Sequence, residues 1–470
     1  MRCFLPVLLF FVLHGIHDPA SAAESKAFVV TSDFSTGTLG AVDLATRVVS
    51  SDVASLGSDA VLRWHGGLLH VVNRFGADNI QVVDPAQGYA TVRQFSVGNG
   101  SNPQDIAFVS PTKAYVSRYG SADLLVVNPS AANGQPMSSI SLAAFADGDG
   151  LPEMSRMIRI GRYLFVACQR LTSFQPLNPS VIVVVDTETD AVVDVDPGTP
   201  GTQAIPLSTR NPITTFEYDR AQARLLIGCT GHFNALDGAV EGINPFTFQN
   251  LGPVVSEQQL GGDLTDIAWH TATHAYALVI QGNSNRLVTW NPSTGLKLAT
   301  IFTASGGFSL PDCEINDRGE LYVCKNPSMP SPGDLPGMLV FSTTTDALLA
   351  GPLYLGLPPI VVTFDHVTDE VTAAPEAPTA FRVAGPWPNP ARGGVRLAVR
   401  LEAAADAEIS VFDLAGRRVR TLASGRWEAG ERAVEWDLSD AAGRPVPTGL
   451  YLVRARIGDR LVVRRLTVLN

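Results

Sequence analysis

A short apolar strand that stops at a polar turn former recurs along most of the chain. Its clearest copy is Asn79-Ile80-Gln81-Val82-Val83-Asp84-Pro85. An apolar run of this length, bounded by Asp, Asn or Pro, is typical of a buried β-strand. Successive copies end 41 to 58 residues apart, and their seven last residues are Asp43, Asp84, Asn128, Asp186, Asn244, Asn291 and Ser342.

An apolar hairpin precedes each copy of this strand. Residues 104–108 turn back into 113–117, and residues 265–269 turn back into 275–279. A hairpin, the recurrent strand and one further strand make a four-stranded blade. Blades with two apolar faces must stack on their neighbours, and stacking in a circle buries both faces. The sequence therefore predicts an all-β protein with a seven-bladed β-propeller. The other hairpins begin near Asp59, Met154, Pro212 and Pro311, with a half-copy at residues 359–364.

The two ends of the repeat region predict a closed ring. The repeats begin at residues 26–31, which match a second strand, and end at residues 359–364, which match a first strand. Joined together, these pieces complete one blade. An open solenoid would instead need capping repeats at both ends.

The repeat region resembles the YVTN-type surface-protein propellers, in which Ala-Tyr-Val-Thr-Asn and Val-Ile-Asp-Thr strands alternate. The likeness is carried by Ala114-Tyr115-Val116-Ser117 and by Val185-Asp186-Thr187-Glu188-Thr189. It covers about three quarters of the chain and implies a propeller at residues 23–367.

A second, smaller domain follows the repeats. Residues 368–380 are polar and rich in Pro and Ala, which is typical of a linker. Residues 381–470 then alternate apolar and polar positions, as expected for an antiparallel, Ig-like β-sandwich. The alternating apolar residues are Val395, Leu397, Val399, Leu401, Ile409, Val411, Leu450 and Leu452.

This second domain resembles the C-terminal sorting domains of type IX secretion cargo and the Ig-like domain of flagellar hook-capping proteins. In many type IX cargoes the last segment is rich in Lys, whereas here it is Arg464-Arg465-Leu466-Thr467-Val468-Leu469. The resemblance implies that residues 381–470 contact a type IX-like export machinery or the cell envelope. The matching segments are Pro388-Asn389-Pro390, Val411-Phe412-Asp413-Leu414-Ala415-Gly416-Arg417, Val419-Arg420-Thr421-Leu422, Trp436-Asp437, Gly443-Arg444-Pro445-Val446 and Thr448-Gly449-Leu450-Tyr451.

The first residues predict export. Arg2 precedes an apolar run at residues 3–13, and Ala20-Ser21-Ala22 suits signal peptidase, so we expect a signal peptide at residues 1–22. The run is shorter than the roughly 20 apolar residues that span a bilayer. No later stretch is long enough, so we expect no transmembrane segment in the mature chain and an extracellular or outer-membrane surface location.

Four cysteines would remain after cleavage. Counting outward from the turn at residues 316–319 places Tyr322, rather than Cys324, opposite Cys313, which would strain a disulfide between these two cysteines. We therefore expect buried free thiols. The four cysteines are Cys168, Cys229, Cys313 and Cys324.

The net charge of −11 hides a difference between the two domains. Residues 1–380 hold 19 Lys and Arg against 35 Asp and Glu, a balance of −16, whereas residues 381–470 hold 15 against 10, a balance of +5. The acidic part would repel phosphates, so we expect no nucleic-acid partner.

Candidate chemistry gathers where loops would meet at one mouth of the propeller. In a meander blade, the loop into the first strand and the loop between the second and third strands open on the same face. Long loops of the latter kind lie at residues 169–180, 230–239 and 325–337, and an acidic loop of the former kind lies at 147–153.

Asp147, Asp149 and Glu153 on the acidic loop could hold Ca²⁺. Two carboxylates two residues apart can face one ion, and the glycines between them permit a tight bend. The loop lacks the later ligands of known calcium loops, and a solvated acidic turn is the alternative interpretation.

Arg170, His232 and Asp237 lie on the long loops of two successive blades and could bind an anionic or sugar ligand. The alternative is structural: Arg170 pairs with a loop carboxylate and His232 caps a turn. His270 and His274 have a spacing known from zinc helices, but they flank a hairpin turn, where we do not expect their side chains to meet.

These patterns favour an exported binding or interaction propeller that recognises a small ligand, a glycan or a protein segment at one mouth. Because propellers host several functions, two alternatives stay open. One is a secreted hydrolase, lyase or lactonase with a metal at the same mouth. The other is a structural surface-layer or adhesion component.

Overall fold

The computed structural model describes residues 24–132, 136–327, 334–365, 370–371, 381–387, 390–401, 404–413, 417–458 and 460–469. The predicted signal peptide and most of the predicted linker lie outside these residues. The chain divides into two compact units, Met1–Ala374 and Pro375–Asn470. Among the described residues, no helix is long and apolar enough to cross a membrane.

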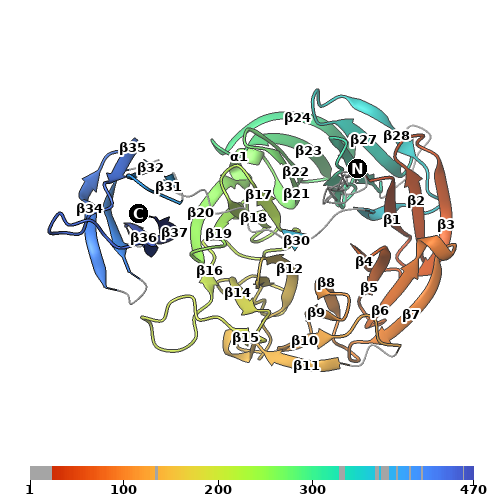
Figure 1. The fold of residues 1–470 in the computed structure, drawn as a ribbon. Helices are drawn as coiled ribbons and strands as arrows, with labels where there is room; N and C mark the ends of the chain where they lie inside the picture. Colours follow the sequence, from red (N-terminus) through yellow and green to blue (C-terminus); the bar gives the residue numbers. More distant parts are fainter. Residues whose placement is uncertain are drawn as a thin grey trace, which may run out of the picture. The chain divides into compact units, whose positions relative to one another are not determined.

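Seven sheets, each with four main antiparallel strands, surround a common centre in the described part of the first unit (Figure 1). The innermost strands are β4 (Ala60–His65), β8 (Pro103–Ser110), β12 (Met154–Ile160), β17 (Glu217–Asp219), β21 (Asp263–Thr271), β25 (Cys313–Ile315) and β29 (Pro359–Phe364). The second strands are β1 (Lys26–Ser32), β5 (Leu68–Asn73), β9 (Lys113–Arg118), β13 (Tyr163–Cys168), β18 (Arg224–Cys229), β22 (His274–Gln281) and β26 (Glu320–Lys325). The outermost strands are β3 (Val49–Leu56), β7 (Ala90–Ser96), β11 (Pro136–Ser141), β15 (Ala191–Val192), β20 (Gln249–Ser256), β24 (Leu296–Ser305) and β28 (Leu348–Leu353).

The recurrent apolar strand of the sequence is the third strand of every one of these sheets, so this prediction is confirmed. The third strands are β2 (Gly37–Asp43), β6 (Asn79–Asp84), β10 (Asp123–Val127), β14 (Val181–Asp186), β19 (Ala239–Asn244), β23 (Ser284–Asn291) and β27 (Gly337–Ser342).

Short elements complete the first unit. The helical turns η1 (Pro85–Gln87), η2 (Ala143–Phe145) and α1 (Glu257–Leu260) lie between sheets or strands. Strand β16 (Ile205–Pro206) pairs with β14. Strand β30 (Glu370–Val371), which falls within the predicted linker, pairs in parallel with β12.

The ring closes in the way that the two ends of the repeat region predicted. Strand β1 pairs with β29 in the antiparallel sense, from Ala27 opposite Phe364 to Thr31 opposite Pro359. One sheet therefore combines the first and the last strands of the propeller, which ties the two ends of the repeat region together.

Side chains that point alternately to the two faces of each strand fill the spaces between neighbouring sheets. On β6, Ile80 and Val82 pack toward the sheet of β8–β11, and Val83 packs toward the sheet of β1–β3. Because successive side chains of a strand point to opposite faces, one apolar run can contribute to two cores. This explains why the sequences of these strands are runs of mostly apolar residues.

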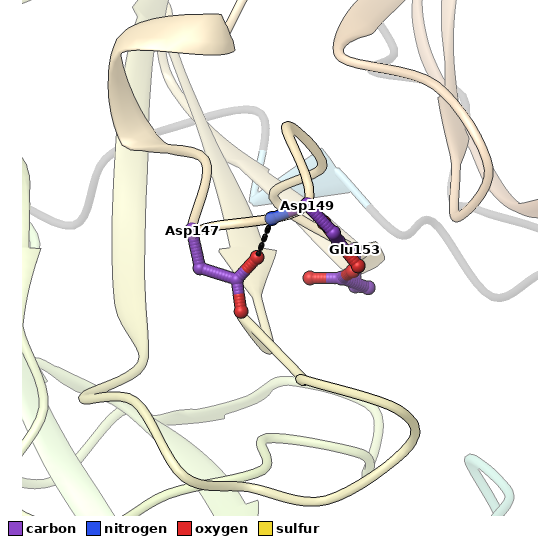
Figure 2. Close-up of side chains that lie close together, drawn as sticks. All are labelled: Asp147, Asp149 and Glu153. Atoms are coloured by element: carbon purple, nitrogen blue, oxygen red, sulfur yellow. Dashed lines mark hydrogen bonds between the residues drawn. The ribbon is translucent and has the colours of Figure 1, made fainter.

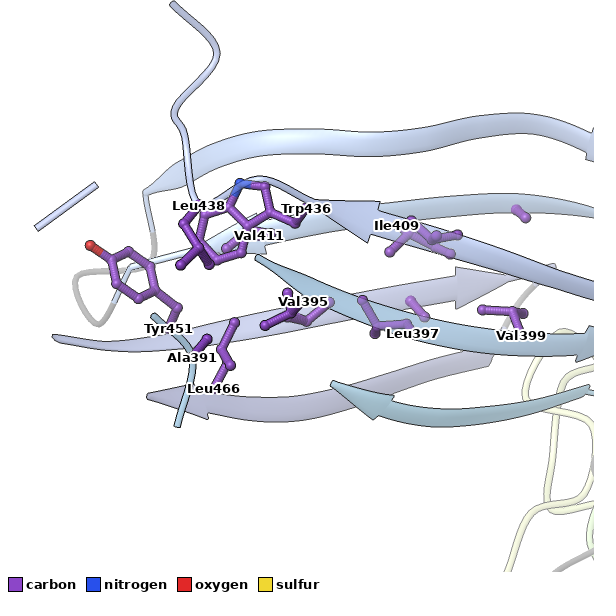
Figure 3. Packing of buried hydrophobic residues seen from close by; sticks show 14 of the residues in the cluster. Ala391, Val395, Leu397, Val399, Ile409, Val411, Trp436, Leu438, Tyr451 and Leu466 are labelled. Atoms are coloured by element: carbon purple, nitrogen blue, oxygen red, sulfur yellow. The ribbon is translucent and has the colours of Figure 1, made fainter. Parts of the chain in front are cut away.

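The second unit is a β-sandwich, as predicted. One sheet has the order β31-β32-β35 and the other has the order β34-β33-β36-β37. Their facing side chains form one core around Trp436, whose indole N–H donates to the carbonyl of Ser439 at 2.7 Å (Figure 3). The strands are β31 (Phe381–Trp387), β32 (Val395–Leu401), β33 (Ala405–Phe412), β34 (Arg418–Trp427), β35 (Gly430–Trp436), β36 (Gly449–Ile457) and β37 (Arg460–Val468).

The predicted register around Cys313 is wrong by one residue. Cys313 lies opposite Val323 rather than Tyr322. The backbone N–H of Asn316 donates to the carbonyl of Glu320, the first residue of β26, at 3.0 Å, so three residues rather than two lie in the turn between the paired positions. The predicted buried free thiols are confirmed for all four described cysteines.

The expectation for the two histidines is also wrong. Strands β21 and β22 join through a tight turn in which Thr271 lies opposite His274. This brings the rings of His270 and His274 to 6.5 Å between centroids. The Nε2 atom of His274 lies 3.0 Å from a carboxylate oxygen of Asp346, which orients this ring.

Candidate functional site

The acidic loop ahead of β12 brings three carboxylates together (Figure 2). Asp147, Asp149 and Glu153 each offer one oxygen, and these oxygens all lie within 4.8 Å of one another. In the described part of the chain, this is the one group of three or more His, Cys, Asp or Glu side chains with that spacing. The structure thus places these predicted residues in one cluster.

Local hydrogen bonds shape the loop. The backbone N–H of Asp149 donates to a carboxylate oxygen of Asp147 at 3.2 Å, and that of Leu151 donates to Asp149 at 2.9 Å. Gly150 has a φ of 87°, in the left-handed region that glycine tolerates best. Asp side chains favour such turns because they bond the backbone two residues on.

The remaining oxygen of Asp147 ties the acidic loop to the long loop between β13 and β14. It accepts the hydroxyl of Thr172 at 3.0 Å and the amide of Asn178 at 2.6 Å. Partial burial raises the pKa of Asp147, but hydrogen bonds from Asp149 and Thr172 outweigh it and lower the pKa below its ordinary value. Asp147 therefore stays ionised.

Glu153 is the buried member of the cluster, with 2% of its surface exposed. One carboxylate oxygen accepts the backbone N–H of Leu171 at 3.0 Å. Burial raises the pKa of Glu153 to about 7, and the charges of Asp149 and Asp147 raise it further, against that hydrogen bond. A cation beside these oxygens would relieve the repulsion, and an all-oxygen donor set suits Ca²⁺.

Arg170 lies beside this cluster. Its guanidinium donates to the carbonyl of Pro179 at 2.8 Å, and its Nε atom is buried without a hydrogen-bond partner among the described atoms. Its charge lowers the pKa of both Asp147 and Glu153. Among the residues that the structure describes, it forms no direct ion pair with these carboxylates and acts on them through space.

His232 and Asp237 form a separate pair within the loop between β18 and β19. The Nδ1 atom of His232 lies 2.8 Å from a carboxylate oxygen of Asp237, whose other oxygen accepts the backbone N–H of His232 at 2.7 Å. No hydrogen bond of the described residues joins Arg170 to this pair. Arg170 and the pair of His232 with Asp237 lie on two different loops, as predicted, and their joint role in ligand binding stays a prediction.

A cavity of about 530 Å³ lies among the innermost strands, and the sequence analysis did not find it. Its walls include Arg63, Arg156, Asp312, Glu314 and His270. Burial lowers the pKa of Arg156 to about 10 and raises that of Asp312 to about 6. The polar lining makes this channel a second candidate site.

Aspartates behind the channel link neighbouring sheets. A carboxylate oxygen of Asp105 accepts the backbone N–H of Met157 at 2.9 Å, and one of Asp266 accepts that of Cys313 at 2.9 Å. Burial raises the pKa of Asp266. A signal was present in the sequence: an Asp stands at the same place in the first strand of several repeats, as in residues 104–108 and 265–269.

Asp105 is also half of a buried ion pair. It is fully buried and receives two hydrogen bonds from the guanidinium of Arg63, at 2.9 and 3.1 Å. By contrast, the pair of Arg74 with Asp59 is partly exposed, at 25% and 36% of the side-chain surfaces. The buried pair therefore has the larger structural role.

Comparisons with known proteins agree with this architecture. Residues 388–458 match the family described as FlgD Ig-like domain. A search of curated proteins finds no match to the chain.

Several solved structures resemble the propeller. A putative 6-phosphogluconolactonase from Bacteroides uniformis aligns with a TM-score of 0.52 at 12% identity, over 73% of this chain and 99% of that one. A quinonprotein alcohol dehydrogenase-like protein from Bacteroides thetaiotaomicron gives 0.49 at 13%, over 73% and 78%. The Dos1 propeller gives 0.47 at 8%, over 91% and 96%. Identities this low bear on fold alone. In fold, this chain is a β-propeller protein with a FlgD Ig-like domain at residues 388–458.

Proposed function

We propose that this chain is an exported protein of the cell surface that binds a ligand with the loops at one mouth of its propeller. In this proposal, Asp147, Asp149 and Glu153 hold Ca²⁺. One observation carries it: three carboxylate oxygens converge within 4.8 Å on a loop that Asp147 ties to residues 169–180. The bound ion would offset most of the negative charge of the carboxylates and hold both loops in one shape.

The second half of the proposal concerns the C-terminal unit. Residues 381–470 address the protein to a type IX-like export machinery or attach it to the cell envelope. The match to the FlgD Ig-like domain and the signal-like residues 1–22 support this role. Intact mass of the protein from its native host tests it. A chain that still begins at Met1 would contradict export by this signal.

Calcium titration by isothermal calorimetry tests the mouth site in the mature full-length chain. We expect one binding event near neutral pH. Asp149→Asn removes one ligand charge and should weaken binding at least about tenfold. Asp196→Asn is the matched control, because Asp196 also accepts a backbone N–H two residues on, from Gly198 at 3.3 Å, in an exposed turn. Absence of binding, or equal effects of both variants, would contradict the calcium site.

A further inference from the structure

Exposed aromatic side chains gather on one face of the propeller. All described aromatics that are large, apolar and exposed lie either between a second and a third strand or ahead of a first strand, and both kinds of loop open on the face of the acidic cluster. We name these residues the aromatic crown. They are Phe34 (73% exposed), Phe75 (82%), Phe174 (79%), Phe233 (44%), Phe308 (58%) and Tyr354 (61%).

Three rings of the crown occupy unfavourable backbone positions. Phe34, Phe174 and Phe308 have φ values of 66°, 63° and 58°. In this left-handed region a bulky side chain is disfavoured, whereas Gly or Asn is tolerated. An exposed ring buries little apolar surface in the core, so a strained backbone at these positions is better explained by binding.

Three of the crown rings lie against a second aromatic ring, close to polar side chains. Tyr119 and Phe174 lie 6.4 Å apart between centroids and are nearly parallel, at 10°. Phe233 and Phe308 lie 5.6 Å apart, edge to face. This first pair adjoins the carboxylates, because Thr172, two residues before Phe174, donates its hydroxyl to Asp147 at 3.0 Å. The second pair includes Phe233, whose neighbour His232 is bonded to Asp237.

Aromatic rings that lie beside charged groups favour some classes of ligand over others. A bilayer or a continuous apolar protein surface would strip water from Asp147, Asp149 and Asp237, which is costly. An anionic polymer would meet the negative charge of the propeller. A neutral sugar stacks the apolar C–H face of its ring on an aromatic ring, and its hydroxyl groups donate hydrogen bonds to carboxylates.

Resting on the proposed function, we infer that the ligand of the mouth is a neutral glycan chain, bound by the aromatic crown and the carboxylates beside Tyr119 and Phe174. Rings on several loops give a chain of sugars several contacts at once. Each contact is weak, but together they give useful affinity.

Affinity electrophoresis of the full-length protein through gels that contain soluble mannan, xylan, galactan or β-glucan tests this inference. We expect at least one polysaccharide to retard the wild type, and Phe174→Asn to weaken retardation about tenfold, as for loss of one aromatic contact. Asn suits the left-handed backbone, so the melting temperature should not fall. Leu298→Thr is the control, because Leu298 is 51% exposed on the outer strand β24, away from the mouth.

Each outcome decides one point. No retardation of the wild type, or equal retardation of Phe174→Asn, overturns the glycan inference. A membrane surface replaces the glycan as the ligand under three conditions. The wild type sediments with zwitterionic phospholipid vesicles, Phe174→Asn does not, and no polysaccharide retards the wild type. Calcium binding measured by calorimetry on the same samples tests the proposed function separately. Retardation without calcium binding would keep the glycan and refute the calcium site.

Discussion

The acidic cluster makes the stability of the propeller depend on pH and calcium together. In the folded protein, burial raises the pKa of Glu153 from 4.5 to about 7, and Asp149 and Asp147 add to this shift. A carboxyl with a raised pKa binds its proton more tightly in the folded than in the unfolded state. Its contribution to stability is complete below about pH 4.5 and is lost as the pH rises through about 7. Without calcium, the protein should therefore become less stable over this range.

Calcium should reverse that loss above pH 7. For an extracellular site with a Kd of about 10⁻⁴ M, calcium at about 5 mM exceeds the Kd roughly 50-fold and stabilises the fold by about 2.3 kcal/mol. A unit of about 350 residues unfolds with an entropy of about 0.7 kcal/mol/K, so the expected rise in Tm is about 3 °C. At about pH 5 the rise should be smaller, because calcium must displace the proton of Glu153.

Scanning calorimetry of the full-length protein in EDTA and in calcium, at about pH 5 and about pH 8.5, measures both effects. Glu153→Gln should flatten the pH dependence in EDTA and reduce the gain from calcium at high pH. Asp196→Asn should change neither. Two results would refute the assignment of Glu153 as a ligand that titrates near pH 7. One is an equal rise in Tm with calcium at the two pH values, and the other is a Glu153→Gln variant whose Tm responds to pH and calcium as that of the wild type does.

Three further predictions address other parts of the molecule. Asp105→Ala should cost about 3–5 kcal/mol in urea unfolding, because it removes a fully buried carboxylate that accepts from the guanidinium of Arg63 and from the backbone N–H groups of Ile106 and Met157, whereas Asp59→Ala should cost at most about 1 kcal/mol; equal costs would contradict the difference in burial. Asp312→Asn should reduce the loss of stability as the pH rises through about 6, since burial raises the pKa of Asp312 to about 6; an unchanged pH profile of Tm would contradict this. Trp436→Ala should cost about 3–5 kcal/mol and lower the melting transition of the C-terminal unit alone; a shift of the propeller transition would contradict the two separate cores.

The strands of this protein could be predicted because their pattern repeats. A run such as that of β14 is apolar on both faces, with Val183 and Val185 in one core and Ile182 and Val184 in another, and only stacking between two sheets buries both. The closure of the ring also followed from the sequence, since residues 26–31 and 359–364 complete one blade. The register at Cys313 could not be predicted, because it depends on whether Asn316 pairs with Gly319 or with Glu320 across the turn.

The candidate site could be predicted only in part, for a physical reason. Asp147, Asp149 and Glu153 lie close in sequence on a tight loop, so few conformations can separate them. Arg170 and His232 lie on different loops, and Asn211 bridges these loops: it accepts from the side chain of Gln169 at 2.9 Å and donates to the carbonyl of Gly231 at 3.4 Å. Sequence spacing does not predict this contact, because Asn211 belongs to a third segment of the chain.

The cavity among the innermost strands could not be predicted from the sequence, because its polar residues resemble those of a solvent-exposed surface. On β12, Arg156 and Arg159 both stand among apolar residues, yet Arg156 lines the cavity, whereas Arg159 donates to the carbonyls of Phe108 and Gly161. A side chain that faces a polar channel and one that faces bulk water both need polar surroundings, so local sequence does not distinguish them. The innermost strands surround a cavity only because the ring of sheets closes.

The positions that depart from the repeat are those that suggest function. A repeat sets strand length and turn type, and the shortest mouth loop, where Gln281 lies opposite Ser284, uses only Gly282 and Asn283. The loop at residues 169–180 is far longer and is held against the acidic cluster rather than by strand pairing. It also carries Phe174 in a strained and exposed position. Length, strain and exposure beyond what the fold requires thus coincide in one loop, and this coincidence is the strongest physical reason to place ligand binding there.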